Sequence, residues 1–344
     1  MAGLRYAAIR SVFELLWATR ATSIFRAMSR ARGVIFTLHR VLPDDAADFS
    51  PNAILQVKPD FLDYAIRRVR ALGFETVDLG EGLRRLESDQ LEKRFAIFTF
   101  DDAYRDNLKY ALPVLRQQQC PFTLYVPTAF VDGVGEIWWQ ALEDIIAKQS
   151  AVALTEGGET DYIPTATLGE KRAAYELIYA KMRAQPEPDR VALIRDLAAK
   201  YEFDLAAQCR DLIMTWQELR SFAAEQLCTL GAHTVHHYEL AKLSAEQAAS
   251  EIAQSLKVME AQFGKRPIHL SYPIGGPTSA GPREYQMAKD LGLRSAVTTI
   301  PGGLYRRQRY ALTALPRVSL NGLFQAHRYM DVFATPALFT AMGR

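Results

Sequence analysis

Two groups of residues in this sequence have the types and spacing that metal-assisted hydrolysis requires. Asp101 and Asp102 directly follow residues 95–100, a run that is apolar apart from one Thr. Such a run predicts a strand buried on both faces, as in a parallel sheet or an α/β barrel, and these folds place their chemistry at the carboxyl ends of strands. Because successive strand residues point to opposite sides, both carboxylates reach one site only if the chain turns there. Taken alone, the pair is equally typical of a helix cap or a turn.

The second group is a cluster of histidines, in which His233, His236 and His237 account for three of the 6 histidines in the chain. If the chain turns helically here, His233 and His237 lie on one face, and imidazoles at that spacing can share a metal ion. A carboxylate with two imidazoles would leave coordination positions open, as a catalytic metal site needs. The alternative is a polar surface turn with chance histidines.

Together these two groups resemble the polysaccharide deacetylase family, also called the NodB homology domain or carbohydrate esterase family 4. Thr99-Phe-Asp-Asp102 corresponds to the family motif T-F-D-D, and His233-Thr-Val-His-His237 corresponds to H-[ST]-x-x-H, in the same order. The resemblance implies an α/β fold, a distorted (β/α) barrel of about seven parallel strands. It also implies that Asp101 is the catalytic base, and that Zn or another divalent ion is bound by Asp102, His233 and His237.

Three further residues receive roles only through this resemblance. His39 ends the apolar run 33–38, and in one branch of the family a histidine at such a strand end is the general acid; a core-edge histidine is the alternative. The run Ile268–Gly275 resembles the third family motif, which implies that the backbone N–H of Tyr272 helps to hold the oxyanion. Arg317 corresponds to a position where relatives carry an arginine that contacts the catalytic aspartate.

Composition limits the class of protein. The chain has 344 residues, of which 49% are hydrophobic and 23% charged, enough for one barrel with an insertion or for two domains. A net charge of +2 gives no reason to expect nucleic-acid binding. Cys120, Cys209 and Cys228 show no CxxC spacing and cannot all pair, so a disulfide framework is not expected.

Residues 1–32 are expected to form a basic amphipathic helix, with six arginines against the single acid Glu14. This helix either packs on the domain or lies on an anionic membrane, and a transit peptide is the third alternative. No apolar run reaches the roughly 18 residues of a spanning helix, and no signal-peptide cleavage site follows. The expected location is therefore the cytoplasm, and the N-terminal helix could also bring the protein to the inner face of a membrane. The oligomeric state is left open.

The rest of the chain is expected to form the barrel at residues 33–330, with a helical insertion at about 140–213 and a tail at 331–344. Within the insertion, residues 151–169 have the composition of a loop, and no histidine occurs, which predicts a lid or wall. Trp138 and Trp139 have two open interpretations, stacking on sugar rings or anchoring the next helix.

The function expected from this sequence is metal-dependent hydrolysis of an N-acetyl group on an amino-sugar polysaccharide or oligosaccharide. The metal polarises the acyl oxygen, Asp101 accepts the proton of water and His39 protonates the leaving amine. The rivals are a deformylase or O-acetyl esterase acting on a glycan or lipid-linked sugar, and a non-catalytic barrel that binds glycans.

Overall fold

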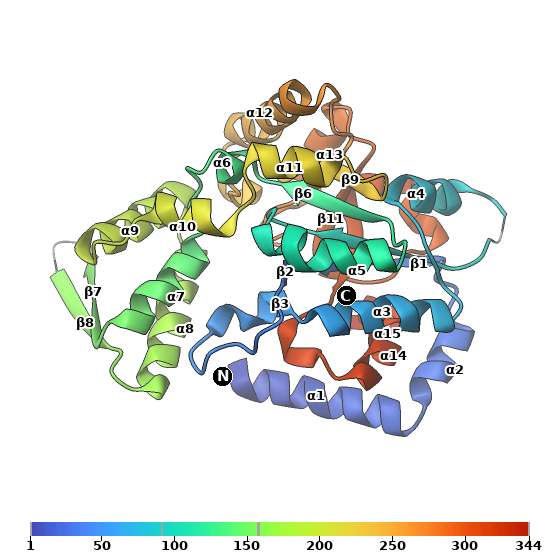
Figure 1. Ribbon diagram of the computed structural model, residues 1–344, viewed down its shortest axis with the longest axis horizontal. Helices are drawn as coiled ribbons and strands as arrows, with labels where there is room; N and C mark the ends of the chain where they lie inside the picture. The colour runs from blue at the N-terminus through green and yellow to red at the C-terminus, as the bar shows by residue number, and fades with distance from the viewer. Residues whose placement is uncertain (1, 91, 157–158, 343–344) are drawn as a thin grey trace.

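A closed barrel of parallel strands forms the centre of the computed structural model, which describes residues 2–90, 92–156 and 159–342 (Figure 1). Its strands follow the order β1-β12-β11-β10-β9-β6-β5, and pairing of β1 with β5, from Gly33↔Phe95 to Leu38↔Phe100, closes the ring. The seven strands are β1 (Gly33–Leu38), β5 (Phe95–Phe100), β6 (Phe122–Val126), β9 (Cys228–Ala232), β10 (His269–Ser271), β11 (Ser295–Pro301) and β12 (Leu315–Ser319). The short β4 (Glu75–Thr76) adds to the start of β5. The expected distorted (β/α) barrel is thus confirmed.

The two faces of each strand bury different sets of side chains, as the period of two requires. Alternate residues of five strands meet in one cluster, which only the barrel interior can accommodate: Ile35, Phe95, Ile97, Tyr125, Val297 and Leu315. The intervening residues of the same strands, such as Phe36 and Phe98, join the larger core beneath the surrounding helices. Both faces are therefore apolar, which explains the continuous apolar runs of β1 and β5.

Helices surround the barrel in the connections between its strands (Figure 1), and one of them, α4 (Leu79–Glu87), packs Leu79, Leu83 and Leu86 against the interior cluster. The other helices are α3 (Pro59–Ala71), α5 (Leu112–Gln117), α11 (Trp216–Ala223), α12 (Ala245–Phe263) and α13 (Pro282–Asp290). Capping boxes begin α11 at Thr215 and α12 at Ser244, as their sequences predict, and Gly264 ends α12 with a φ of 68°. A π-helical turn, η2 (Asn107–Ala111), precedes α5.

The segment between β6 and β9 extends to one side of the barrel (Figure 1). It contains α6 (Thr128–Val131), α7 (Trp138–Lys148), α8 (Leu168–Ala184), α9 (Glu187–Lys200) and α10 (Leu205–Leu212). The expectation of a loop at residues 151–169 was wrong, because β7 (Ala151–Glu156) and β8 (Glu159–Pro164) form an antiparallel hairpin. The exposed Thr and acidic residues that resembled a loop belong to the solvent side of β8.

The N-terminal and C-terminal segments pack on each other at one side of the barrel (Figure 1). Residues 1–32, expected to form one helix, contain two, α1 (Ala2–Ala18) and α2 (Ala21–Met28). Phe13 of α1 is buried among the rings of Phe324, Tyr329, Phe333 and Phe339, next to α14 (Met330–Phe333) and α15 (Pro336–Met342). No helix in the described ranges is long and apolar enough to cross a membrane.

Candidate active site

The Asp-Asp pair lies where β5 ends, at the carboxyl edge of the barrel. Asp101 continues the inward face of the strand, and its N–H still donates to the Leu38 carbonyl at 3.0 Å. The chain then turns, because Asp102 and Ala103 have φ values of 73° and 57°. This turn is the condition under which two consecutive carboxylates reach one site. Both carboxylates line the same cavity, and they are 2% and 1% exposed.

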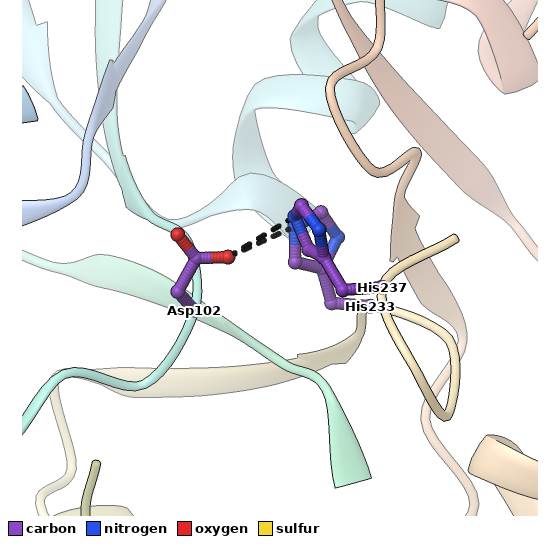
Figure 2. A group of neighbouring side chains, drawn as sticks. All are labelled: Asp102, His233 and His237. Carbon is purple, nitrogen blue, oxygen red and sulfur yellow. Dashed lines mark ion pairs between the residues drawn. The ribbon is translucent and has the colours of Figure 1, made fainter. Parts of the chain in front are cut away.

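The histidine cluster follows β9 in a loop, so the helical turn considered from the sequence is not formed. Thr234 and His237 have φ values of 65° and 60°, and the Thr234 hydroxyl accepts the His237 N–H at 3.1 Å. This conformation brings the rings of His233 and His237 to 4.8 Å between centroids. The Nε2 atoms of His233 and His237 lie 3.5 Å and 3.3 Å from Asp102 Oδ1 (Figure 2).

This three-residue group has the donors that a divalent cation requires. One ligand atom from each residue lies within 4.8 Å of the others, and all three residues are buried. Asp102 Oδ1 is buried without a hydrogen-bond partner, which is costly for a carboxylate oxygen unless a cation satisfies it. His233 Nδ1 donates to the Ser271 carbonyl at 2.7 Å, the arrangement that leaves Nε2 free to bind a metal. Burial lowers the pKa of His237 to about 3, so its imidazole is neutral, which is the metal-binding form.

Arg317 on β12 meets Asp101 inside the mouth of the barrel. Its Nη1 and Nη2 donate to the two carboxylate oxygens of Asp101 at 2.8 Å and 2.7 Å, and the guanidinium is also fixed by Thr298 O, Thr99 Oγ1 and Ser271 Oγ. Burial alone would raise the pKa of Asp101, but the charge and hydrogen bonds of Arg317 outweigh burial and hold this pKa well below its usual range. Asp101 is therefore ionised at neutral pH.

His39 lines the same cavity as both aspartates and is half-buried. Its backbone carbonyl accepts the Asn107 side-chain amide at 2.8 Å, which ties the end of β1 to η2. Asp106, next to Asn107, accepts from Arg40 Nε and the Val41 N–H, and so fixes the residues that follow His39. Within the described chain, the imidazole of His39 has no hydrogen-bond partner, so it is free to meet a ligand.

The role expected for Tyr272 is contradicted by the structure. Its backbone N–H donates to the Val297 carbonyl at 3.1 Å, in line with the pairing of β10 and β11, and it is therefore not available to an oxyanion. Its hydroxyl donates to the Thr313 carbonyl at 2.8 Å, and the residue does not line the cavity. Ile274, two positions later, does line the cavity, and its N–H has no partner in the described ranges. Sequence reasoning missed it, because nothing in the residue type identifies a free N–H.

Left-handed backbone conformations concentrate around the cavity. Asp102, Ala103, Thr234, His237 and Ile274 all have positive φ, between 57° and 73°. Non-glycine residues in this region cost about 1–3 kcal/mol each and occur where the surrounding structure enforces them, often at active sites. Thr234 and Ile274 are the strongest cases, since β-branched residues rarely adopt φ values of 65° and 60°.

The cavity has a volume of about 840 Å³, and the expected insertion forms one of its walls. Residues of α8 that line it are Arg172, Tyr175, Glu176 and Tyr179. Trp138 and Trp139 are both buried at the start of α7, as anchors would be, yet Trp139 also lines the cavity, with its ring 4.9 Å from that of His237.

The remaining histidines lie outside the cavity lining. His236 is exposed, and its Nδ1 pairs with Glu251 of α12 at 2.6 Å. His269 is buried against Ser295 Oγ at 2.8 Å. His327 is exposed and stacks on Tyr64 with ring centroids 3.8 Å apart. These three residues therefore have structural partners or face solvent.

Comparisons with known proteins agree with this fold. A family model described as polysaccharide deacetylase matches residues 178–296, which include His233 and His237 but not His39, Asp101 or Asp102. The Bacillus subtilis (strain 168) protein named "Putative polysaccharide deacetylase YxkH" is 30% identical over 108 residues, which are 31% of this chain. That match spans only 37% of the length of the curated relative.

Two solved structures share the fold. Streptococcus pyogenes deacetylase PplD in complex with acetate has a TM-score of 0.55 and 18% identity, covering 86% of this chain and 94% of that one. IcaB from Ammonifex degensii has a TM-score of 0.54 and 17% identity, covering 89% of this chain and 97% of that one. At such identities the likeness concerns the fold alone. The family model over residues 178–296, the curated relative and these two structures thus make this chain similar to polysaccharide deacetylases in part of its sequence and in its fold.

Proposed function

We propose that this chain is a metal-dependent deacetylase that hydrolyses the N-acetyl group of an amino-sugar polysaccharide or oligosaccharide. The similarity to polysaccharide deacetylases supports a hydrolase of carbon–nitrogen bonds. The observation that carries the proposal is one cavity lined by an ionised carboxylate, a three-residue group suited to a metal and a half-buried imidazole without a partner. Each of these parts corresponds to a requirement of amide hydrolysis.

Asp102, His233 and His237 are the residues that would hold the metal. A carboxylate and two imidazoles with positions left open form a ligand set typical of catalytic zinc, so we infer Zn as the ion. When bound, it supplies Lewis-acid chemistry at the acyl carbonyl and makes a water molecule more acidic.

Asp101 is the base in this proposal. It accepts the proton of water as the water attacks the acyl carbon, and it is ready to do so because Arg317 keeps it ionised. Ser271 Oγ, which donates to Asp101 Oδ2 at 3.2 Å, helps to fix the orientation of the carboxylate. The buried ion pair thus positions the base as well as setting its charge.

His39 and Ile274 complete the reaction. The free imidazole of His39 protonates the leaving amine, without which a tetrahedral intermediate returns to the amide. The unpartnered N–H of Ile274, rather than that of Tyr272, stabilises the developing oxyanion, because a fixed donor is most effective where charge appears during the reaction.

Asp101→Asn tests this assignment. The variant is expected to retain its metal and to lose about 10²–10⁴-fold in acetate release from an N-acetylated chitooligosaccharide, since it lacks a base and not a ligand. His236→Gln is the control, because that exposed histidine lies outside the cavity lining. Loss of metal from Asp101→Asn in proportion to activity would make Asp101 a ligand and overturn the roles. A panel of N-formyl and O-acetyl glycans tests which acyl group the enzyme removes. If kcat/KM is larger on either of these than on the N-acetyl glycan, that acyl group replaces N-acetyl in the proposal.

A further inference from the structure

The outer side of the two N-terminal helices exposes an unusual number of large apolar side chains. Six of the exposed large hydrophobic residues in the described chain lie between residues 12 and 28, and they are Val12, Leu15, Trp17, Ile24, Phe25 and Met28. Leu15, Ile24 and Met28 are 63%, 61% and 76% exposed. We call the surface formed by Val12, Leu15, Ile24, Phe25 and Met28 the α1–α2 face. Trp17, four residues after the buried Phe13, lies toward the packed side of α1, with the Arg328 guanidinium 5.9 Å from its ring. Concentrated exposed apolar surface on a soluble domain marks an interaction site.

Helical geometry explains why this face has no partner within the chain. Ala8, Val12 and Leu15 recur at spacings of four and three residues on α1, away from the buried Phe13. On α2, Ile24 and Met28 lie opposite Thr22 and Arg26, which are buried against the domain. Each helix is therefore packed through one side and exposes large apolar side chains on the other, with Ser11 among them on α1. A helix whose only role was to cover the barrel would expose polar residues there.

The charges around this face favour an anionic partner. Arg20 and Arg30 are exposed and have no carboxylate partner within the described ranges. Glu14 is the only acidic residue among residues 1–32, and it is neutralised by Arg328 and by the Tyr329 hydroxyl. The face therefore combines apolar side chains with unpaired cations and has no free negative charge.

We propose that the α1–α2 face docks on the surface of an anionic phospholipid bilayer. Helices that combine an apolar side with flanking arginines lie in the plane of the membrane interface, with apolar side chains inserted and cations at lipid headgroups. The 17 residues of α1 and 8 of α2 are too short to span, which agrees with a surface position. In Figure 1, α1 and α2 border the same side of the molecule, so that both can contact one plane.

The same helix also reaches the catalytic cavity. Tyr6 of α1 lines it together with Leu323, whose carbonyl accepts Arg10 Nη2 at 3.2 Å, and with the apolar Ile54 and Leu55. Tyr6 is seven residues before Phe13, so it lies on the packed side of α1 and brings this helix to the cavity wall. Provided that the proposed deacetylase function holds, we infer from this contact between α1 and the cavity that the substrate is an N-acylated sugar carried on a lipid, with the sugar at the metal group and the lipid toward the bilayer.

Flotation of the full chain with vesicles of phosphatidylcholine and phosphatidylglycerol tests the docking. The triple variant Leu15→Gln/Ile24→Gln/Met28→Gln is expected to bind at least about tenfold more weakly, because three inserting side chains become polar. The control is Val134→Gln/Tyr162→Gln/Leu177→Gln, whose side chains are 67%, 75% and 57% exposed elsewhere, and it should bind like the wild type. Arg20→Gln/Arg30→Gln should remove most of the dependence on phosphatidylglycerol.

Two results would overturn the docking proposal: absence of wild-type flotation, or equal binding by the triple variant and the wild type. Sedimentation velocity provides a separate readout. If the wild type self-associates, does not bind vesicles and becomes monomeric in the triple variant, the face is a contact between copies of this chain.

Activity measurements separate the substrate from the docking. On a soluble N-acetylated oligosaccharide the triple variant should match the wild type, because its residues lie outside the cavity; on a lipid-linked N-acetylated sugar in the same vesicles it should fall at least about tenfold. Equal rates of wild type and variant on the vesicle substrate would refute the lipid-linked substrate. A wild type that floats with vesicles but releases acetate from neither substrate would refute the deacetylase function and leave the docking intact.

Discussion

For the replacement of Arg317 by Met, the structure defines the expected loss of unfolding free energy better than for any other substitution considered. Arg317 and Asp101 are 1% and 2% exposed and are joined by hydrogen bonds of 2.8 Å and 2.7 Å. Removing one partner of a buried, bidentate ion pair leaves an uncompensated charge and costs about 3–5 kcal/mol. Ser271 Oγ, 3.2 Å from Asp101 Oδ2, is the one remaining side-chain donor to Asp101 in the described chain. We therefore expect Arg317→Met to lose about 3–5 kcal/mol of unfolding free energy at pH 7.

This loss should depend on pH with a defined sign. The pKa of Asp101 in the folded protein lies below the value of about 3.9 that an unfolded aspartate has. A depressed pKa stabilises the fold fully above the unfolded pKa and loses this contribution as the pH falls through the folded pKa. In Arg317→Met, burial raises the pKa of Asp101 instead, so the penalty is greatest at neutral pH. Because the unfolded pKa is common to both proteins, the difference between wild type and variant should begin to shrink as the pH falls through the raised pKa of Asp101 in the variant, above about 3.9. It should continue to shrink toward the lowered pKa of the wild type.

Urea denaturation in the presence of a chelator measures this effect without a contribution from metal. The double variant Arg317→Met/Asp101→Asn should lose less than the sum of the two single variants, because it leaves neither charge unpaired. Arg84→Gln, which removes an exposed arginine paired with Glu81, is the control and should leave the unfolding free energy unchanged within error. A loss below about 1 kcal/mol in Arg317→Met, or additive single and double variants, would refute the reasoning.

Three further substitutions test individual residues. His39→Ala should retain fold and metal but hydrolyse N-acetyl substrates very slowly, whereas its rate on an activated ester with a good leaving group should fall much less. Equal losses of rate on both substrates would exclude His39 as the general acid. His233→Ala should abolish metal binding and activity, measured by metal analysis and acetate release, and stoichiometric metal in a His233→Ala/His237→Ala variant would disprove the ligand assignment. Ile274→Gly keeps the backbone N–H and relieves a positive φ, so kcat should be largely retained, whereas a loss of about 10²-fold would mean that the side chain of Ile274 is required.

The sequence was most informative where a local pattern of residues determines the secondary structure. The apolar run before Asp101 predicted a strand buried on both faces, and pairing with β1 along its whole length confirms it. The fold was accessible because buried parallel strands and capping boxes are local signals. The hairpin β7–β8 was missed, since its exposed Thr and acidic residues have the composition of a loop.

Features that depend on the environment of the backbone were not accessible. The N–H of Tyr272 is directed by the pairing of β10 with β11, which depends on a strand that follows much later in the chain. The conformations of Thr234 and Ile274 have positive φ that neither residue type favours, so only the assembled site explains them. The role carried over for Tyr272 therefore failed at the level of the backbone N–H, whose partner is set by strand pairing and not by residue type.

The segment that forms one wall of the cavity begins and ends at adjacent strands. β6 and β9 pair directly in register, from Phe122↔Cys228 to Val126↔Ala232, although the whole segment with α7 and α8 lies between them in sequence. The two ends of this segment are therefore close together, and the distance between them does not depend on how many residues the segment contains. Segments of this kind tolerate insertion and exchange. The wall of the cavity that α8 forms can therefore change in length or sequence without altering the register of β6 and β9, the strand that leads to His233.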